Sequence, residues 1–355
     1  MIVPIVNNVC LSSGVVSGLL LTTPPADAVH DTVNNGVVMS MLKSWRHRSR
    51  LWLSLRRGYG VIKRFFRIAA LPPVVYYHYL GKCREYYSAR CLSALSELPP
   101  FSERPFNKYL KRGASGRAKL RAANAMLDFL EHQFSHDGLD LIYSGEQEGM
   151  LLADIALKSG ENAQLKLMRS RFPREGDLGL YLFDSADELV YAMTFSVVEQ
   201  GQLLIGGVQG PKPEHGAEIV KEMTRQMHGL RPKNLLLSAI YIIARQYNLS
   251  SIKGISDKTH IKSQHLRSSY NAFWEESGGL ADNNGWFDLP DGEPLRDIET
   301  VKSQHRSAFR KREALRTAAM TDTARTLRWF SAPQIAPQQA DPIAAEDMAS
   351  HGGRA

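Results

Sequence analysis

The sequence predicts an α+β protein, in which a basic helical segment at the N-terminal side precedes a mixed sheet flanked by helices. Residues 39–121 combine 19 Lys and Arg and only three Glu with apolar residues at helical spacing. Residues 150–208 contain short apolar runs separated by Gly, Asp and Ser, a pattern typical of strands joined by tight turns. After residue 210, helical and strand patterns alternate, which favours a crossover connection.

Residues 1–40 are expected to be a disordered leader or an overextended start. Residues 9–28 are apolar and end in Ala-Asp-Ala, but no Lys or Arg precedes them, and Ser and Gly dilute the run. A signal peptide is therefore not favoured, and Met39 or Met41 are alternative start positions.

Residues 41–136 form the predicted basic helical region. Residues 42–68 carry Trp, Phe, Arg and Lys at spacings of three and four, which indicates an amphipathic helix. Helices are also predicted at 74–95, before Pro99, and at 116–136. The aromatic side of such a basic helix either packs on the main domain or lies on an anionic membrane surface, and packing is slightly favoured.

The α/β core domain is expected at residues 137–298. Strands are predicted at 139–143, 150–156, 163–171, 178–183, 189–198 and 202–208, and the later ones have connections too short for crossover helices. Helices at 217–228 and 234–247 should then lead to a strand at 250–256, which would lie parallel to the strand at 202–208. A helix at 263–277 and a strand at 285–289 complete the domain.

The C-terminal part is predicted to hold a basic helix within residues 299–330 and a disordered tail at 331–355. The tail is rich in Ala, Pro, Gln and Asp. The helix carries six Lys and Arg between residues 302 and 316, which permits contacts with phosphate groups. No nucleic-acid motif accompanies them, so a membrane surface is the favoured partner over nucleic acid.

Five blocks resemble the VirK/YbjX family over roughly residues 45–318. They are Gly206-Gly-Val-Gln-Gly210, Gly229-Leu-Arg-Pro-Lys233, Gly254-Ile-Ser-Asp-Lys-Thr-His260, Ser269-Tyr-Asn-Ala-Phe-Trp-Glu-Glu276 and His305-Arg-Ser-Ala-Phe-Arg-Lys-Arg312. The resemblance implies a Gram-negative bacterial protein associated with virulence, resistance to cationic antimicrobial peptides and maintenance of the envelope. It implies no particular biochemical activity.

The predicted succession of strands and helices is also that of N-acetyltransferase-like folds. In such folds, an acyl carrier such as acyl-CoA binds along the strand before the crossover and at the following helix N-terminus. The candidate cofactor-binding residues are Gly206, Gly207, Gln209, Gly210, Arg231 and Lys233. The usual Gly-x-Gly loop is replaced by a Pro-containing turn, so a bulged strand and a solvated loop are the favoured structural alternatives.

Two residues are candidates for moving protons in such a reaction. His260 follows the strand at 250–256, where α/β folds gather ligands, and it could act as a general base. Tyr270 could donate a proton to a leaving thiolate. The structural alternatives, a loop hydrogen bond for His260 and core packing for Tyr270, are favoured.

The composition narrows the remaining options. The odd, sparse set of three cysteines, Cys10, Cys83 and Cys91, favours a reducing compartment. They form no CxxC pair, so the sequence gives no basis for a metal site. The sequence has no run of about 18 uninterrupted apolar residues. We therefore expect a cytoplasmic protein, peripheral on the inner membrane if its basic helices bind anionic lipid. It would be either an acyltransferase-like enzyme or a non-catalytic envelope accessory protein.

Overall fold

A computed structural model describes residues 70–90, 103–144, 148–211, 214–266, 268–294 and 297–333. The predicted leader, the predicted helix at 42–68 and the predicted tail beyond residue 333 lie outside these ranges. The chain divides into two compact units, Met1–Val61 and Ile62–Ala355. The expected boundaries after residues 136 and 298 both fall inside the second unit, which holds every element described below.

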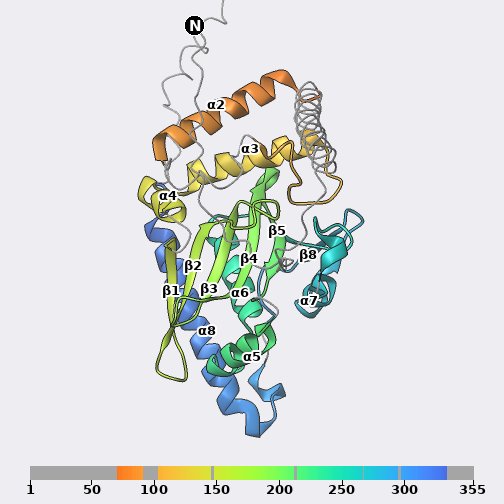
Figure 1. Cartoon of the computed structure of the whole chain (residues 1–355). Coiled ribbons are helices and arrows are strands. Elements are labelled where there is room, and N and C mark those ends of the chain that lie inside the picture. The colour runs from red at the N-terminus through yellow and green to blue at the C-terminus, as the bar shows by residue number, and fades with distance from the viewer. Residues whose placement is uncertain are drawn as a thin grey trace, which may run out of the picture. The chain divides into compact units, whose positions relative to one another are not determined.

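The second unit is built on one eight-stranded sheet within the described residues (Figure 1). The strands are β1 (Met150–Ala156), β2 (Asn162–Arg169), β3 (Leu178–Phe183), β4 (Leu189–Val198), β5 (Gln202–Gln209), β6 (Ser251–Ile255), β7 (Leu280–Ala281) and β8 (Trp286–Leu289). Their order is β1-β2-β3-β4-β5-β6-β8-β7. All neighbouring pairs are antiparallel except β5 and β6, which are parallel. The mixed α/β class and the predicted parallel pair are confirmed.

Helices surround this sheet. They are α2 (Pro73–Arg90), α3 (Gly116–Gln133), α4 (His136–Tyr143), α5 (Gly216–Gln226), α6 (Pro232–Gln246), α7 (Tyr270–Glu276) and α8 (Ser303–Trp329). α6 and α8 contact each other and pack on strands of the sheet, and α3 contacts β4. α2 packs on α3 at the far side from the sheet (Figure 1).

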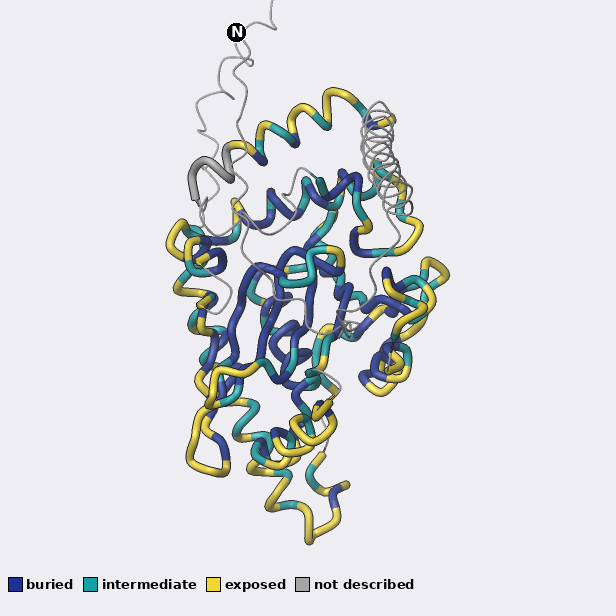
Figure 2. The backbone as a smooth tube through the Cα atoms, viewed as in Figure 1, coloured by how far each residue is buried: buried dark blue, intermediate teal, exposed yellow. Residues whose placement is uncertain are grey.

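The core lies between the sheet and these helices, as the buried segments in Figure 2 indicate. α6 contributes most of its side chains to it, because the run Leu235 to Ala244 is apolar all round, as expected for a central helix. On α3 the buried residues recur at spacings of three and four, which leaves a polar stripe on the opposite side.

Two predictions of secondary structure were wrong. Residues 139–143 are not a strand but belong to α4, because Ser135 caps the helix N-terminus and Leu139, Ile142 and Tyr143 are buried at helical spacing. The helix expected over 263–277 is reduced to α7 and a short 3-10 turn at Ser263–His265, since Ser269 caps α7 only at Tyr270.

The other predicted elements that fall within the described residues are confirmed, with shifts of a few residues at their ends. The terminal helix lies within the predicted range 299–330, because α8 continues to Trp329 and buries Ala319, Met320, Thr323 and Leu327. The two-residue strand β7 was not predicted, and a strand of that length has no recognisable periodicity.

Candidate functional site

The first candidate site is the place where the parallel strands β5 and β6 part. Their pairing runs from Gln202 with Ser251 to Ile205 with Gly254, and the remaining residues of β5 have no partner on β6. We call the space beside Gly206 to Gln209 the fork. It lies at the carboxyl end of both strands, where open α/β sheets commonly bind ligands.

Both predicted catalytic residues project into the fork. Tyr270, at the start of α7, donates its hydroxyl proton to the Val208 carbonyl at 2.8 Å and accepts from the Val208 amide at 3.0 Å. The His260 ring lies edge-on to the Tyr270 ring, with centroids 5.1 Å apart. The α7 start is held there because Asp257 Oδ1 accepts from the Tyr270 amide.

Glu175 is the third side chain of the fork, and sequence reasoning missed it. It is fully buried and comes from the loop between β2 and β3. Its Oε2 accepts from Gln209 at 2.7 Å, and its Oε1 forms an ion pair with Lys262 at 3.1 Å. The only sequence signal is an acidic residue beside Gly176, directly before a buried strand, which is too common a pattern to single it out.

Glu175 and His260 face each other inside the protein. Glu175 Oε1 lies 3.9 Å from His260 Nε2, and both residues have no exposed surface. His260 Nδ1 accepts from the Lys262 amide at 3.0 Å, so the neutral ring carries its proton on Nε2. Burial lowers the pKa of His260, although the Glu175 charge acts in the opposite direction. The histidine is therefore held neutral at physiological pH.

The two predicted glycines of β5 are positions of close backbone approach, and the approaching group is Glu175. A Cβ on Gly206 would lie 1.9 Å from the Glu175 carbonyl oxygen, and one on Gly207 would lie 2.0 Å from Glu175 Oε2. Tyr270 uses both the amide and the carbonyl of Val208. In this structure, the protein's own groups thus occupy the backbone that an acyl carrier would use.

The remaining predicted cofactor residues gather near the end of β5. Arg231 forms an ion pair with Glu276 of α7, and the Lys233 ammonium lies 4.3 Å from the centre of the Phe273 ring. Burial lowers the pKa of Lys233. Gly210 is exposed beside Tyr191. Burial raises the pKa of Tyr191, although the nearby Arg231 charge acts in the opposite direction. Whether these residues bind a phosphate stays a prediction.

A second candidate region is the outer face of α2. Val74 and Tyr77 are 69% and 77% exposed, and they share this face with His78 and the exposed Arg84. The opposite face is also apolar, because Tyr79 and Cys83 are buried against the rest of the unit. Burial raises the pKa of the Cys83 thiol to about 12, so this cysteine is unreactive at neutral pH.

The second basic region, the beginning of α8, lies at the other end of the unit. Figure 1 places α2 beyond α3 at one end of the sheet and the first turns of α8 at the opposite end. Lys302, Arg310 and Lys311 are exposed there. A flat surface that contacts the outer face of α2 therefore does not reach the start of α8.

Membrane-spanning helices and metal clusters are both absent from the described residues. None of the described helices is both long and apolar enough to cross a membrane. Within the same ranges, no group of three or more His, Cys, Asp and Glu side chains could hold a metal ion.

Comparison with known proteins identifies relatives without an established activity. Residues 66–325 match a family model described as "Protein of unknown function (DUF535)". The chain is 28% identical over 246 residues to the uncharacterized protein YbjX of Escherichia coli (strain K12), which covers 66% of this chain and 74% of that protein. It is 30% identical over 145 residues to an uncharacterized protein of Haemophilus influenzae, 39% of this chain and 49% of the relative.

A third relative and one solved structure complete the comparison. The relative is a protein of Mannheimia haemolytica named "Membrane protein LapB", with 27% identity over 222 residues, 62% of this chain and 86% of its own. The structure is a mutant form of a cAMP-binding acyltransferase from Mycobacterium smegmatis, at a TM-score of 0.26 and 8% identity over 59% of this chain and 60% of the other. A likeness this weak carries no argument about activity.

Proposed function

Because this chain belongs to the DUF535 family and is related to YbjX of Escherichia coli, we propose that it acts at the cell envelope. It would do so by binding an anionic membrane surface through α2. The observation that carries the proposal is the exposure of Val74 and Tyr77 on the outer face of α2, beside the exposed Arg84. In water, a helix with apolar residues on both faces leaves one of them without a partner.

The charge of the surrounding sequence supports an anionic lipid as that partner. Residues 39–121, which include α2, carry an excess of 16 positive charges, from 19 Lys and Arg against three Glu. Each Lys or Arg near an anionic membrane contributes about 1 kcal/mol to binding. Burial of a side chain such as Tyr77 in the interface adds roughly a further 1.5–3 kcal/mol. The name of the LapB relative, a membrane protein, agrees with this location.

Vesicle co-sedimentation of the full chain tests the proposal. We expect recovery with phosphatidylglycerol vesicles to exceed recovery with phosphatidylcholine vesicles, and Tyr77→Glu to weaken binding about tenfold or more, since it replaces an inserted ring by a charge. Leu280→Glu is the matched control, because Leu280 is 75% exposed on β7, away from α2. Equal recovery with both vesicle types, or equal loss in both variants, would contradict the proposal.

A second candidate is an acyltransferase-like activity at the fork, directed at an envelope component. It is favoured by the parallel pairing of Leu203 with Ile252 and by the convergence of His260 and Tyr270 on the fork. An acyl carrier could enter only after Tyr270 releases Val208. Thermal-shift measurements with acetyl-CoA and longer acyl-CoAs test it, since a ligand of the folded state raises the melting temperature. No shift, together with unchanged function in Arg231→Ala, would exclude this activity.

A further inference from the structure

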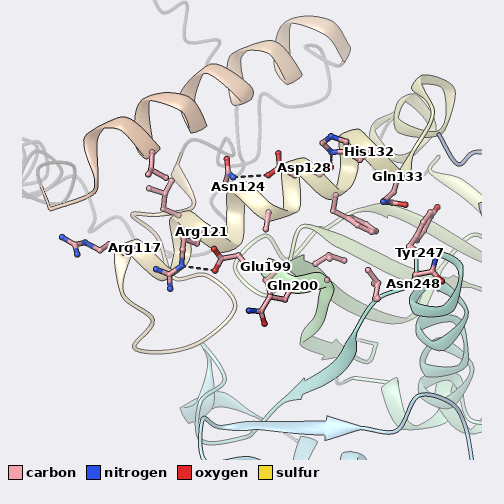
Figure 3. A pocket seen from close by; sticks show the side chains of 18 of the residues that line it. Arg117, Arg121, Asn124, Asp128, His132, Gln133, Glu199, Gln200, Tyr247 and Asn248 are labelled. Carbon is pink, nitrogen blue, oxygen red and sulfur yellow. Dashed lines mark hydrogen bonds and ion pairs between the residues drawn. The ribbon is translucent and has the colours of Figure 1, made fainter. Parts of the chain in front are cut away.

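A cavity of about 870 Å³ lies under α2, between α3, the β4–β5 turn and the end of α6 (Figure 3). We call it the α3 groove. Its volume is in the range of pockets that hold small molecules. It lies at the amino-terminal ends of the parallel strands β5 and β6, the opposite end of that pair from the fork.

The lining of the α3 groove is apolar in its depth and polar at its rim. Phe129 and Tyr247 meet edge-to-face with ring centres 5.4 Å apart, and Leu120, Val197 and Leu249 extend this apolar floor. Val75 of α2 contributes to the cover. Because the two rings are buried against each other, they offer no open face on which a base could stack, so the floor suits an aliphatic chain rather than a nucleotide.

The rim is the polar stripe of α3, and its charges are unevenly distributed. Arg117 and Arg121 lie at the N-terminal end of α3, where the helix dipole adds positive potential. At the other end of the groove, α3 and α6 both end, at Gln133 and Gln246, and their dipoles add negative potential there. Figure 3 shows the two arginines on one side and His132 with Tyr247 on the other.

The two carboxylates of the rim are already paired. Asp128 forms an ion pair with Lys82 of α2 and accepts from Asn124 at 3.2 Å. Glu199 pairs with Arg121 at 3.0 Å, with both side chains more than half exposed. Such an exposed pair contributes less than about 1 kcal/mol, so a competing anion can take over Arg121 at little cost. Arg117 is exposed and forms no ion pair with any described residue.

We propose that the α3 groove binds one molecule of an anionic membrane lipid, its phosphate held by Arg117 and Arg121 and an acyl chain lying along the floor towards Tyr247. The choice of a membrane lipid as the ligand rests on the proposed function, because α2 contributes both to the cover of the groove and to the face proposed to lie on the membrane. The protein would thereby hold a single lipid beside the surface from which it came.

Calorimetric titration of the full chain with dihexanoyl phosphatidic acid below its micelle concentration tests the groove without a membrane. We expect saturable binding of one molecule, and inorganic phosphate alone to bind at least tenfold more weakly, because it leaves the apolar floor empty. Dihexanoyl glycerol, which lacks the phosphate, should also bind at least tenfold more weakly. If inorganic phosphate binds as tightly as dihexanoyl phosphatidic acid, the proposal of a lipid is wrong and the groove is a simple anion site.

Variants place the binding in the groove. Arg117→Gln combined with Arg121→Gln should weaken the affinity about tenfold, whereas Arg225→Gln, which breaks a comparably exposed pair with Glu222 on α5, should not change it. Ala125→Trp, which fills the groove, should abolish binding, and its melting temperature reports whether it folds. Unchanged affinity in the arginine double variant would contradict the proposal even if the tryptophan variant unfolds.

The two proposals fail separately. Tyr77→Glu should lose vesicle binding but keep the affinity for the soluble short-chain lipid, because Tyr77 does not line the groove. If the soluble lipid does not bind while vesicles still do, the groove is not a lipid site and the proposed function stands.

Discussion

The two ends of the parallel pair β5 and β6 differ in how the protein uses its polar groups. At the fork, Glu175, His260 and Tyr270 are buried, and they contact one another or the backbone of β5. At the α3 groove, Arg117, Arg121 and Glu199 are exposed around an apolar floor. A polar cluster at the expected ligand-binding end of a sheet can therefore be structural, while the opposite end stays open.

The difference follows from the backbone. At the fork, Gly206 and Gly207 allow the β2–β3 loop to approach β5, and this loop brings in Glu175. Burying such polar groups costs free energy, which the hydrogen bonds of Tyr270 to Val208 and of Gln209 to Glu175, and the ion pair of Glu175 with Lys262, help to offset. At the groove, Arg117, Arg121 and Glu199 remain in solvent, so they need no partner inside the protein. Substitutions at the fork should therefore cost stability, and those at the groove should cost ligand binding.

The largest effect is expected for Gly206→Ala. Its Cβ would lie 1.9 Å from a backbone oxygen, which cannot move like a side chain, so we expect a loss of about 3 kcal/mol or more in the free energy of unfolding. Urea denaturation measures it. Gly292→Ala is the control, because no atom lies within 4 Å of its Cβ position. If Gly206→Ala leaves the protein as stable as the parent, the fork is not closed as described.

Removing the buried carboxylate is expected to have the next largest effect. Glu175→Ala leaves Gln209 and Lys262 without their partner, and a hydrogen bond to a charged group contributes about 1.5–3 kcal/mol. We therefore expect the free energy of unfolding, measured by urea denaturation, to fall by about 2–3 kcal/mol. If the variant keeps its stability but loses an acyltransferase activity, the fork is catalytic rather than structural.

Tyr270→Phe should lower the free energy of unfolding by about 1–2 kcal/mol, because the Val208 amide and carbonyl would both lose a buried hydrogen-bond partner. Hydrogen exchange at the Val208 amide gives the local readout, and it should become faster. If Tyr270→Phe instead raises the affinity for an acyl-CoA, the phenol acts as a plug that a ligand displaces, and the fork is a binding site after all.

The pH dependence of stability should show a smaller effect of His260. Burial lowers its pKa in the folded protein below the unfolded value of about 6.5, so the unfolded chain binds the proton more readily. The stabilisation is complete above that unfolded pKa and is lost as the pH falls. We expect the free energy of unfolding to fall by about 1 kcal/mol or less between roughly pH 8 and pH 6. The His260→Gln variant should not show this pH dependence. Glu175, Lys262 and Asp257 are the charges nearest the ring.

The smallest effect on stability is expected at the groove. Arg117→Gln and Arg121→Gln should each change the free energy of unfolding by less than about 0.5 kcal/mol, because both side chains are exposed. A loss above roughly 1 kcal/mol in either variant would show that the rim is also a structural cluster, and the contrast between the two ends would disappear.

Much of the fold could be predicted from the sequence because its signals are local. Turn residues between alternating apolar runs indicated the antiparallel strands, and the two helices after Gly210 indicated the parallel pair. Residues 139–143 were misassigned because a short apolar run does not distinguish a strand from a helical turn, and the decisive residue, Ser135, lies before the run.

The site was less predictable because its contacts are distant in the sequence. His260 was selected from its place in the predicted topology and Tyr270 from the chemistry of its phenol, and the structure brings both to the fork. Glu175 was missed because only the folded chain shows that its loop meets β5. The α3 groove was missed for the same reason, since Arg117, Glu199 and Tyr247 come from three separate segments. Whether His260 and Tyr270 act in catalysis stays a prediction.

Backbone amide chemical shifts of the full chain, recorded with and without dihexanoyl phosphatidic acid, give the most direct test. They report whether the α3 groove binds the lipid while the fork only supports the fold. We expect the changes to concentrate at Arg117 to His132, Gly201 and Asn248, which line the α3 groove. Changes centred on Gly206 to Gln209 and His260, with none along α3, would contradict the account.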